Sequence, residues 1–278
     1  MAIITISREM GSGGIPIVQS AAEELGYTLV DGDTIASVAI EYGLTLESLE
    51  AVDEKPLAFI DKADKNLEVA QRQVELIILE YALKGNIIVY GRGGQDLLKG
   101  VDNVLRVRIT APFEERVERW SEREWLDPEL ARILVRRSDQ QRAGFIKYYF
   151  DRDWNDPLGY DLLINTSRLT EETAIKLICE GVRDQNLLEM KEGAKKILRD
   201  RILAKRGEIK LLASGLLHGL HYYHFHLDVV DGVAALGGHV HSNQQRAEVH
   251  KILRSVAGIK EIIDHLEIRA YETTPQEN

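Results

Sequence analysis

The sequence has little of what an exported or membrane-spanning protein needs. It contains one cysteine among 278 residues, so no disulfide can form within the chain. No run of about 18 apolar residues occurs, and the opening MAIITISREMGSGG lacks the basic segment and long apolar core of a secretion signal. We therefore expect a cytoplasmic protein without a transmembrane segment, with Cys179 as a buried structural thiol.

An excess of positive charge is also missing. Lys and Arg number 35 against 45 Asp and Glu, which gives a formal net charge of −10. Proteins that neutralise nucleic-acid phosphates carry basic stripes or patches, so no nucleic-acid partner is expected. The acidity belongs to residues 1–188, which carry 22 basic and 33 acidic side chains, and the rest of the chain is nearly neutral.

What the chain does have is an ordinary globular composition, with 44% hydrophobic and 29% charged residues. Its length exceeds the usual size of one domain and favours two. We expect a first domain at 1–182, a polar linker at 183–193, a second domain at 194–270 and a polar tail at 271–278.

The first domain alternates strand and helix patterns. Such alternation is typical of a parallel sheet covered by helices on both faces, so we predict an α/β fold with five parallel strands. Apolar residues recur at helical spacing over 18–25, 67–83, 113–124, 129–149 and 170–181, and the first helix is expected to start near Ile15-Pro16. The five β-rich runs are Ile3–Ser7, Tyr27–Val30, Ile87–Tyr90, Leu105–Ile109 and Asp161–Asn165.

The second domain has a different order of elements. After a helix at 194–206, two β-rich runs at 223–230 and 233–240 flank Asp231-Gly232, the strongest short hairpin signal. A helix at 243–256 and a strand at 259–268 follow. The pattern α-β-β-α-β predicts a small α+β domain.

A glycine-rich loop follows the first strand. Glycines let backbone N–H groups converge on a phosphate, and the N-terminus of the next helix favours an anion. A complete phosphate loop reads G-x-x-x-x-G-K-[ST], but here Arg8 stands at the first glycine, Gly14 at the lysine and Ile15 at the hydroxyl residue. Either this loop binds phosphate, with Arg8 as its cation, or it only makes a tight turn. The predicted phosphate-binding residues are Gly11, Ser12, Gly13 and Gly14.

Several segments resemble the cytidylate kinase-like family: ITISREMGSGG at the start, VYGRGG near residue 90, and RRSDQQR and YDLLINTSRLT further on. The resemblance spans Ala2 to Gly181. It implies a P-loop kinase-like fold and a relation to cytidylate kinase, which uses ATP and Mg²⁺ to phosphorylate CMP or dCMP. The family commonly has arginine after the double glycine, where this chain has Ile15, so Arg8 is left to replace the missing lysine.

The resemblance also implies an acceptor site. It assigns Arg92 to the acceptor phosphate, and a planar guanidinium suits phosphate oxygens. The competing interpretation is that Arg92 only pairs with a surface carboxylate. Asp139 and Arg142 match an acceptor-binding Asp-x-x-Arg pair. Arg136 lies three residues before Asp139, near the same side of a helix, and is expected with Arg8 to neutralise the transferring group.

Other charged residues have competing interpretations. Asp31, at the end of the second strand, is expected to contact the acceptor, while Asp33 caps a helix beginning at Thr34. Three arginines of the following helices are expected on a solvated face with weak ion pairs. They are Arg116, Arg119 and Arg123.

The second domain resembles a BON domain, with Asp231-Gly232-Val233 at its hairpin and Val256-Ala257-Gly258-Ile259 before its last strand. BON domains are small binding modules, so the resemblance implies a ligand, lipid-surface or protein partner and a regulatory or assembly role.

All eight histidines lie after residue 217. A two-residue hairpin turn places His224, His226, His239 and His241 on one face of the sheet, opposite its apolar face. Three interpretations stay open: a metal site, a binding face sensitive to pH near 6.5, and a plain polar surface. No cysteine accompanies them, and no metal ligand is assigned.

Three functions are compatible with these patterns. The first is ATP-dependent phosphoryl transfer to a nucleoside monophosphate, cytidylate-like, or a similar small acceptor. The alternative is a catalytically impaired nucleotide sensor or an assembly protein that uses the BON-like domain. A dinucleotide-binding oxidoreductase is a third, since Asp31 follows Gly11-x-Gly13 by about 20 residues, although Pro16 stands at the third glycine.

Overall fold

The computed structural model describes residues 2–54, 65–187, 192–216 and 225–269, and the chain divides into two compact units. The first comprises Met1–Ala58 and Ile77–Lys195, and the second Phe59–Leu76 and Lys196–Asn278. The domain boundaries drawn from the sequence remain predictions. The structural division differs from them in placing residues 59–76 in the second unit.

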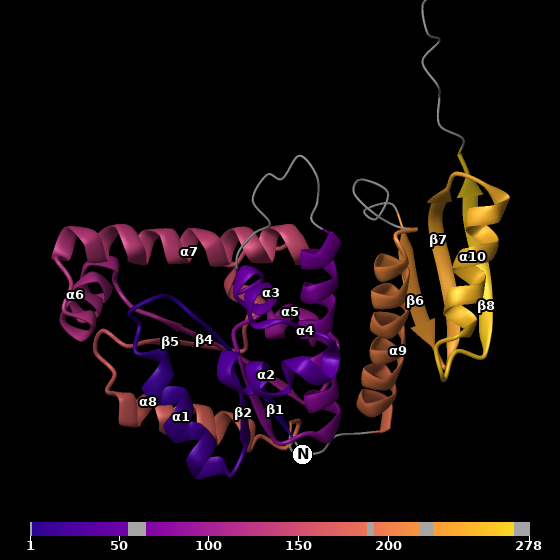
Figure 1. The fold of residues 1–278 in the computed structure, drawn as a ribbon. Coiled ribbons are helices and arrows are strands. Elements are labelled where there is room, and N and C mark those ends of the chain that lie inside the picture. Colours follow the sequence, from indigo (N-terminus) through magenta and orange to yellow (C-terminus); the bar gives the residue numbers. More distant parts are fainter. Residues whose placement is uncertain (1, 55–64, 188–191, 217–224, 270–278) are drawn as a thin grey trace, which may run out of the picture. The chain divides into compact units, whose positions relative to one another are not determined.

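The first unit contains a five-stranded parallel sheet in the order β2-β3-β1-β4-β5, flanked by helices (Figure 1). The predicted parallel sheet is therefore confirmed, and each strand end lies within one residue of the expected run. The strands are β1 (Ile3–Arg8), β2 (Thr28–Val30), β3 (Ile87–Tyr90), β4 (Val104–Thr110) and β5 (Leu162–Asn165).

The helices of this unit include one for every predicted stretch, and the first begins at Gly14, one residue before its expected start near Ile15-Pro16. Short 3-10 helices lie at Ala39–Tyr42 and Pro157–Gly159, and α4 (Lys65–Lys84) runs through the division between the units. The others are α1 (Gly14–Leu25), α2 (Gly32–Val38), α3 (Leu46–Ala51), α5 (Gly94–Leu97), α6 (Phe113–Glu124), α7 (Pro128–Phe150) and α8 (Glu171–Val182).

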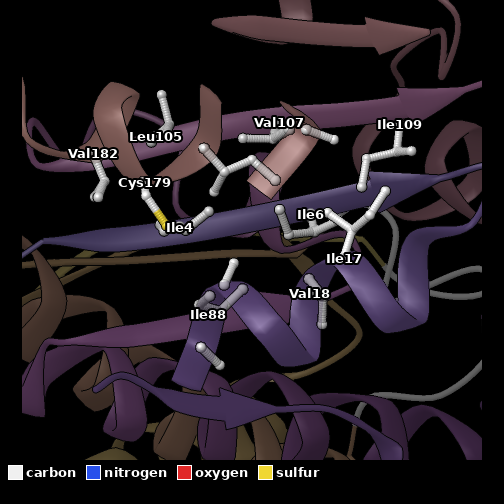
Figure 2. Packing of buried hydrophobic residues seen from close by; sticks show 14 of the residues in the cluster. Ile4, Ile6, Ile17, Val18, Ile88, Leu105, Val107, Ile109, Cys179 and Val182 are labelled. Atoms are coloured by element: carbon white, nitrogen blue, oxygen red, sulfur yellow. The ribbon is translucent and has the colours of Figure 1, made fainter. Parts of the chain in front are cut away.

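One face of the sheet packs against α1 and α8. Because side chains alternate along a strand, Ile4 and Ile6 of β1 share this face and lie near Ile17 of α1 (Figure 2). Ile178 of α8 belongs to the same buried cluster. All four are at most 1% exposed. Cys179 is buried in the same cluster, as predicted.

The carboxyl ends of the central strands meet at one edge of the sheet. β1 runs into the glycine loop, and β3 runs into the Gly91–Gly93 turn. Since β3 and β4 are both direct neighbours of β1, the loops after these three strands lie side by side. This is the edge where parallel α/β sheets bind ligands.

The second unit has the predicted α-β-β-α-β order. The turn at Asp231-Gly232 pairs Val230 with Val233 in an antiparallel hairpin, and the last strand adds in parallel, giving the order β6-β7-β8. Buried side chains of this sheet pack against α9 and α10. The elements are α9 (Glu192–Ser214), β6 (His226–Val230), β7 (Val233–Val240), α10 (Asn243–Arg254) and β8 (Glu261–Ile268).

Candidate functional site

The loop after β1 allows close approach to its backbone. Gly11 and Gly13 both have φ of +80°, in the left-handed region that favours glycine. A Cβ atom at Gly11 would lie 2.4 Å from the carbonyl oxygen of Arg116, so a side chain does not fit there. Gly13 is the N-cap of α1 and supplies no capping side chain, which leaves the first N–H groups of the helix available to an anion.

A cavity of about 300 Å³ opens beside this loop. Ser12, predicted to bind phosphate with the glycines, is fully buried outside the lining, and its hydroxyl donates to the carbonyl oxygen of Glu9 at 2.7 Å. Four arginines border the cavity. The lining residues are Arg8, Glu9, Met10, Gly11, Gly13, Gly14, Ile15, Pro16, Tyr90, Arg119, Trp120, Arg123, Arg142 and Glu171.

Arg8 is held in this wall by Glu54. Its Nη1 donates to both carboxylate oxygens of Glu54, at 2.7 and 2.6 Å, and its Cζ lies 4.2 Å from the ring centroid of Tyr90. The side chains of Arg8 and Glu54 are only 14% and 11% exposed. The cation at the cavity is therefore already paired with a carboxylate of the same chain.

Glu54 accepts two more hydrogen bonds. Nε of Arg142 donates to Oε2 at 3.0 Å, and the backbone N–H of Arg92 donates to Oε1 at 2.7 Å. Gly91, Arg92 and Gly93 all have positive φ, a conformation in which a turn can present its N–H groups to an anion. The Gly-Arg-Gly turn and two guanidinium groups thus converge on one carboxylate.

The charges in this cluster reinforce one another. Burial by itself would raise the pKa of the Glu54 carboxyl, but Arg8 and Arg142 outweigh it and hold that pKa well below its usual range. Burial also opposes the charge on Arg8, and Glu54 reverses this effect and raises the pKa of Arg8. Glu54 and Arg8 therefore form a buried ion pair, and the guanidinium of Arg142 contacts the same carboxylate.

Arg92 and Asp31 lie away from the cavity lining. Nη2 of Arg92 pairs with Asp53 at 3.0 Å and would lie 3.8 Å from a Cβ at Gly32, the residue after Asp31. The prediction that Asp33 caps a helix at Thr34 is wrong. The helix begins at Gly32, so Asp31 is its N-cap and accepts from the N–H of Thr34 at 2.9 Å.

Asp139 supports the loop from α7. Its Oδ1 accepts from the backbone N–H of Met10 at 3.1 Å, and its Oδ2 accepts from Nη1 of Arg116 at 2.7 Å. The same Nη1 donates to the Met10 carbonyl at 3.0 Å. The prediction of a solvated Arg116 is therefore wrong: this residue is 5% exposed because the loop and Asp139 enclose it.

The remaining helix arginines differ in position. Arg123 is exposed and pairs with Glu124, as expected for a solvated face, whereas Arg119 is half-buried and donates to Thr166. Both border the cavity. Arg136 is exposed and lies beside the ring of Phe113, outside the cavity lining. Arg142 is the member of the predicted acceptor set that reaches the cavity.

The arginines and backbone N–H groups beside the cavity suit the phosphates of ATP better than they suit a metal ion bound by the protein alone. Ile15 replaces the hydroxyl that would hold Mg²⁺, and Glu9 accepts from Arg108, Thr110 and the Ala111 N–H. Glu171 also borders the cavity and has an oxygen 3.7 Å from a Cβ position at Gly13. Since Mg²⁺ is commonly bound through few carboxylates plus substrate phosphates, Glu171 is the residue that would hold it.

The histidine face is only partly described, because His224 lies outside the described residues. His226 pairs with Gly237, which pairs in turn with His265, and the rings of His239 and His241 are 6.1 Å apart. Within the described parts of the chain, no group of three or more His, Cys, Asp or Glu is arranged to hold a metal. None of the helices in those parts is long and apolar enough to cross a membrane.

Comparison with known proteins identifies both parts of the chain. The cytidylate kinase-like family matches residues 3–168, more than half of the sequence. This chain belongs to that family. The BON domain model matches residues 210–270, which confirms the second resemblance.

Individual proteins that are similar to this chain agree with the family assignment. A cytidylate kinase from Methanopyrus kandleri is 31% identical over 185 residues, covering 63% of this chain and 90% of that protein. One from Natronomonas pharaonis is 31% identical over 175 residues, with 61% and 83% covered. An uncharacterized protein from Eubacterium ventriosum shares the fold, with a TM-score of 0.55 at 21% identity over 66% of this chain and all of that one.

The sequence patterns did not point to Glu54, the carboxylate at the centre of the site. Glu54 belongs to no motif and lies 46 residues from Arg8 along the chain. Tyr90 could have been found, because it stands directly before the Gly-Arg-Gly turn.

Proposed function

We propose that this chain transfers the γ-phosphoryl group of ATP to a nucleoside monophosphate of the cytidylate type. One observation carries the proposal: the cavity joins the uncapped N-terminus of α1 to four arginine side chains. Anionic phosphates suit such a site. The cytidylate kinases among the relatives indicate the class of acceptor.

The residues divide between donor and acceptor. Gly11, Gly13 and Gly14 with the first turn of α1 bind the donor phosphates, and Arg8 supplies the charge of the missing lysine. Mg²⁺ bound with ATP would neutralise charge on its phosphates. Arg92, beside the start of α2, is the acceptor-side contact, with Asp31 as its neighbour. Catalysis rests on positioning and charge neutralisation.

The helix arginines take revised roles. Arg119 and Arg123, which border the cavity, replace Arg136, which lies outside its lining, as the groups that neutralise the transferring phosphoryl. Asp139 acts as a positioning residue, because its contacts are with Met10 and Arg116.

The decisive experiment is ADP release from ATP·Mg²⁺ with CMP, dCMP, UMP, AMP and GMP tested separately. We expect turnover with CMP or dCMP. In Arg123→Ala, the turnover number falls by about 100-fold because a charge opposite the transferring group is lost. Arg132→Ala is the control, since this arginine pairs with exposed Glu114 and lies outside the cavity lining. No turnover with any acceptor, or equal rates in both variants, contradicts the proposal.

A nucleotide sensor is the second candidate. It is favoured by Gly14 and Ile15 at the motif's lysine and hydroxyl positions and by the ion pair that occupies Arg8. Calorimetric binding of ATP or CMP without product formation would establish this role. In either case the BON domain is proposed as the binding or regulatory module.

A further inference from the structure

The donors around Glu54 form a set that suits a phosphate group as well as a carboxylate. Two guanidinium groups, from Arg8 and Arg142, and one backbone N–H, from Arg92, converge on the same two oxygens at 2.6 to 3.0 Å. Charge-assisted bonds of this kind are strong, and arginines bind phosphate and carboxylate with the same fork geometry. The recognition is therefore of an anion rather than of glutamate in particular.

The backbone around this anion leaves no room for other side chains. A Cβ at Gly91 would lie 2.3 Å from Oε1 of Glu54 and 2.3 Å from Nη1 of Arg8. The carboxylate therefore lies directly against the turn, at the edge of the sheet where β1 and β3 end.

Two observations connect this anion position with the cavity. Arg8 and Arg142 each contact Glu54 and line the cavity. In addition, Nε of Arg8 is buried and has no hydrogen-bond partner within the described parts of the chain. A tetrahedral phosphate offers more acceptor oxygens than a carboxylate does and is suited to engage a guanidinium through several N–H groups.

We propose that the Glu54 carboxylate is a built-in occupant of a phosphate subsite, which a phosphate group displaces when it binds to Arg8, Arg142 and the N–H of Arg92. The inference rests on the proposed function for its ligand class, phosphate groups, but does not require turnover. Phosphate binds only to molecules in which Glu54 has left the subsite. The apparent affinity for phosphate is therefore the intrinsic affinity multiplied by the fraction of molecules whose subsite is free.

The test uses inorganic phosphate as the probe, titrated calorimetrically into the full chain at constant ionic strength. Glu54→Gln removes the competing charge but keeps the shape of the side chain. If Glu54 occupies the subsite in nine of ten molecules, the dissociation constant for phosphate falls by about tenfold in this variant. An unchanged or weaker affinity overturns the proposal, because Glu54 would then only position the arginines.

The matched control is Glu47→Gln, which makes the same change of side chain a few residues away. Glu47 is an exposed residue of α3 and forms no ion pair with Arg8, Arg92 or Arg142 among the described residues. Because exposed charges are screened, the phosphate affinity changes by less than about twofold. An equal gain in both variants also overturns the proposal, since general charge removal would explain it.

Glu54→Asp keeps the proposal testable if Glu54→Gln does not fold. The shorter carboxylate preserves the counter-charge but cannot reach all three donors, so phosphate binds more tightly than to the natural chain, by a smaller factor. Equal or weaker binding overturns the idea. Turnover does not enter these titrations, so a failed kinase assay and a failed phosphate subsite remain distinguishable.

Discussion

Two buried carboxylates, one in each unit, are surrounded by cations in similar ways. Glu54 accepts from Arg8 and Arg142. Glu75, on α4 within the second unit, accepts from Arg72 and Lys205 at 2.8 Å each and is 2% exposed. Burial opposes the charge on both, and in both the neighbouring cations prevail, lowering the pKa of Glu75 to about 2.

The two sites differ in the backbone that surrounds them. The donors to Glu75 come from regular helices, including Gln71 and Arg72 on its own helix. Glu54 instead receives an N–H from a left-handed turn, and its arginines line a cavity. A strongly lowered pKa is therefore common to a structural ion cluster and a ligand site, and the geometry separates them.

Removal of the structural carboxylate gives the largest expected effect. Glu75→Ala breaks the buried cluster and leaves Glu208 as the remaining carboxylate beside Arg72 and Lys205, which destabilises the second unit by about 3 kcal/mol. Urea denaturation followed by circular dichroism measures the loss. Glu248→Ala, at an exposed ion pair with Lys251, is the control and changes stability by less than about 0.5 kcal/mol. A loss of stability below about 1 kcal/mol would show that the remaining charged groups rearrange or become hydrated in the variant.

Acid tests the lowered pKa of Glu75 by removing its charge. A carboxyl whose pKa is lowered in the folded state contributes stability above its unfolded pKa of about 4.3, and that stability is lost as pH falls through the folded pKa. For Glu75 the contribution is on the order of 3 kcal/mol. The difference in unfolding free energy between the natural chain and Glu75→Gln should narrow by that amount from about pH 5 to about pH 2. A constant difference would refute the lowered pKa.

The turn beside Glu54 is tested by a pair of glycine substitutions. Gly91→Ala places a methyl group 2.3 Å from Arg8 and Glu54, and with its φ of +77° the change costs about 2 kcal/mol. Gly26→Ala has a φ of +64° but no atom within 4 Å of the new Cβ, so it isolates the backbone cost of about 1 kcal/mol. Thermal denaturation compares the two. Equal losses of stability in the two variants would mean that Arg8 and Glu54 move away from the new methyl group at no cost in free energy.

The smallest expected effect is the gain in stability that inorganic phosphate gives to variants of the two carboxylates. In Glu54→Gln an inorganic phosphate can replace the lost anion, and at about five times its dissociation constant it restores about 1 kcal/mol of stability. In Glu75→Gln the same phosphate concentration adds no more than it does to the natural chain. Urea titrations with and without phosphate measure both. Equal responses would remove the distinction between the sites.

Much of the fold could be predicted from the chain itself. Alternating strands and helices gave the parallel sheet, and Asp231-Gly232 gave the hairpin register, because both are local patterns with a fixed period or turn geometry. The site was predicted less completely. The glycines of its loop were found from their spacing. Ser12 was predicted to bind phosphate with them, and in the structure its hydroxyl donates to the carbonyl oxygen of Glu9.

The sequence by itself determined the positions of the glycine loop, the Gly-Arg-Gly turn and the helices, since these depend on neighbouring residues. Only the tertiary structure decided which carboxylate meets which arginine. Glu54 and Arg8 are 46 residues apart, and Asp139 and Arg116 are 23 apart. Such pairs form where strand order brings chain segments together, so among many charged side chains the folded geometry alone selects the partners.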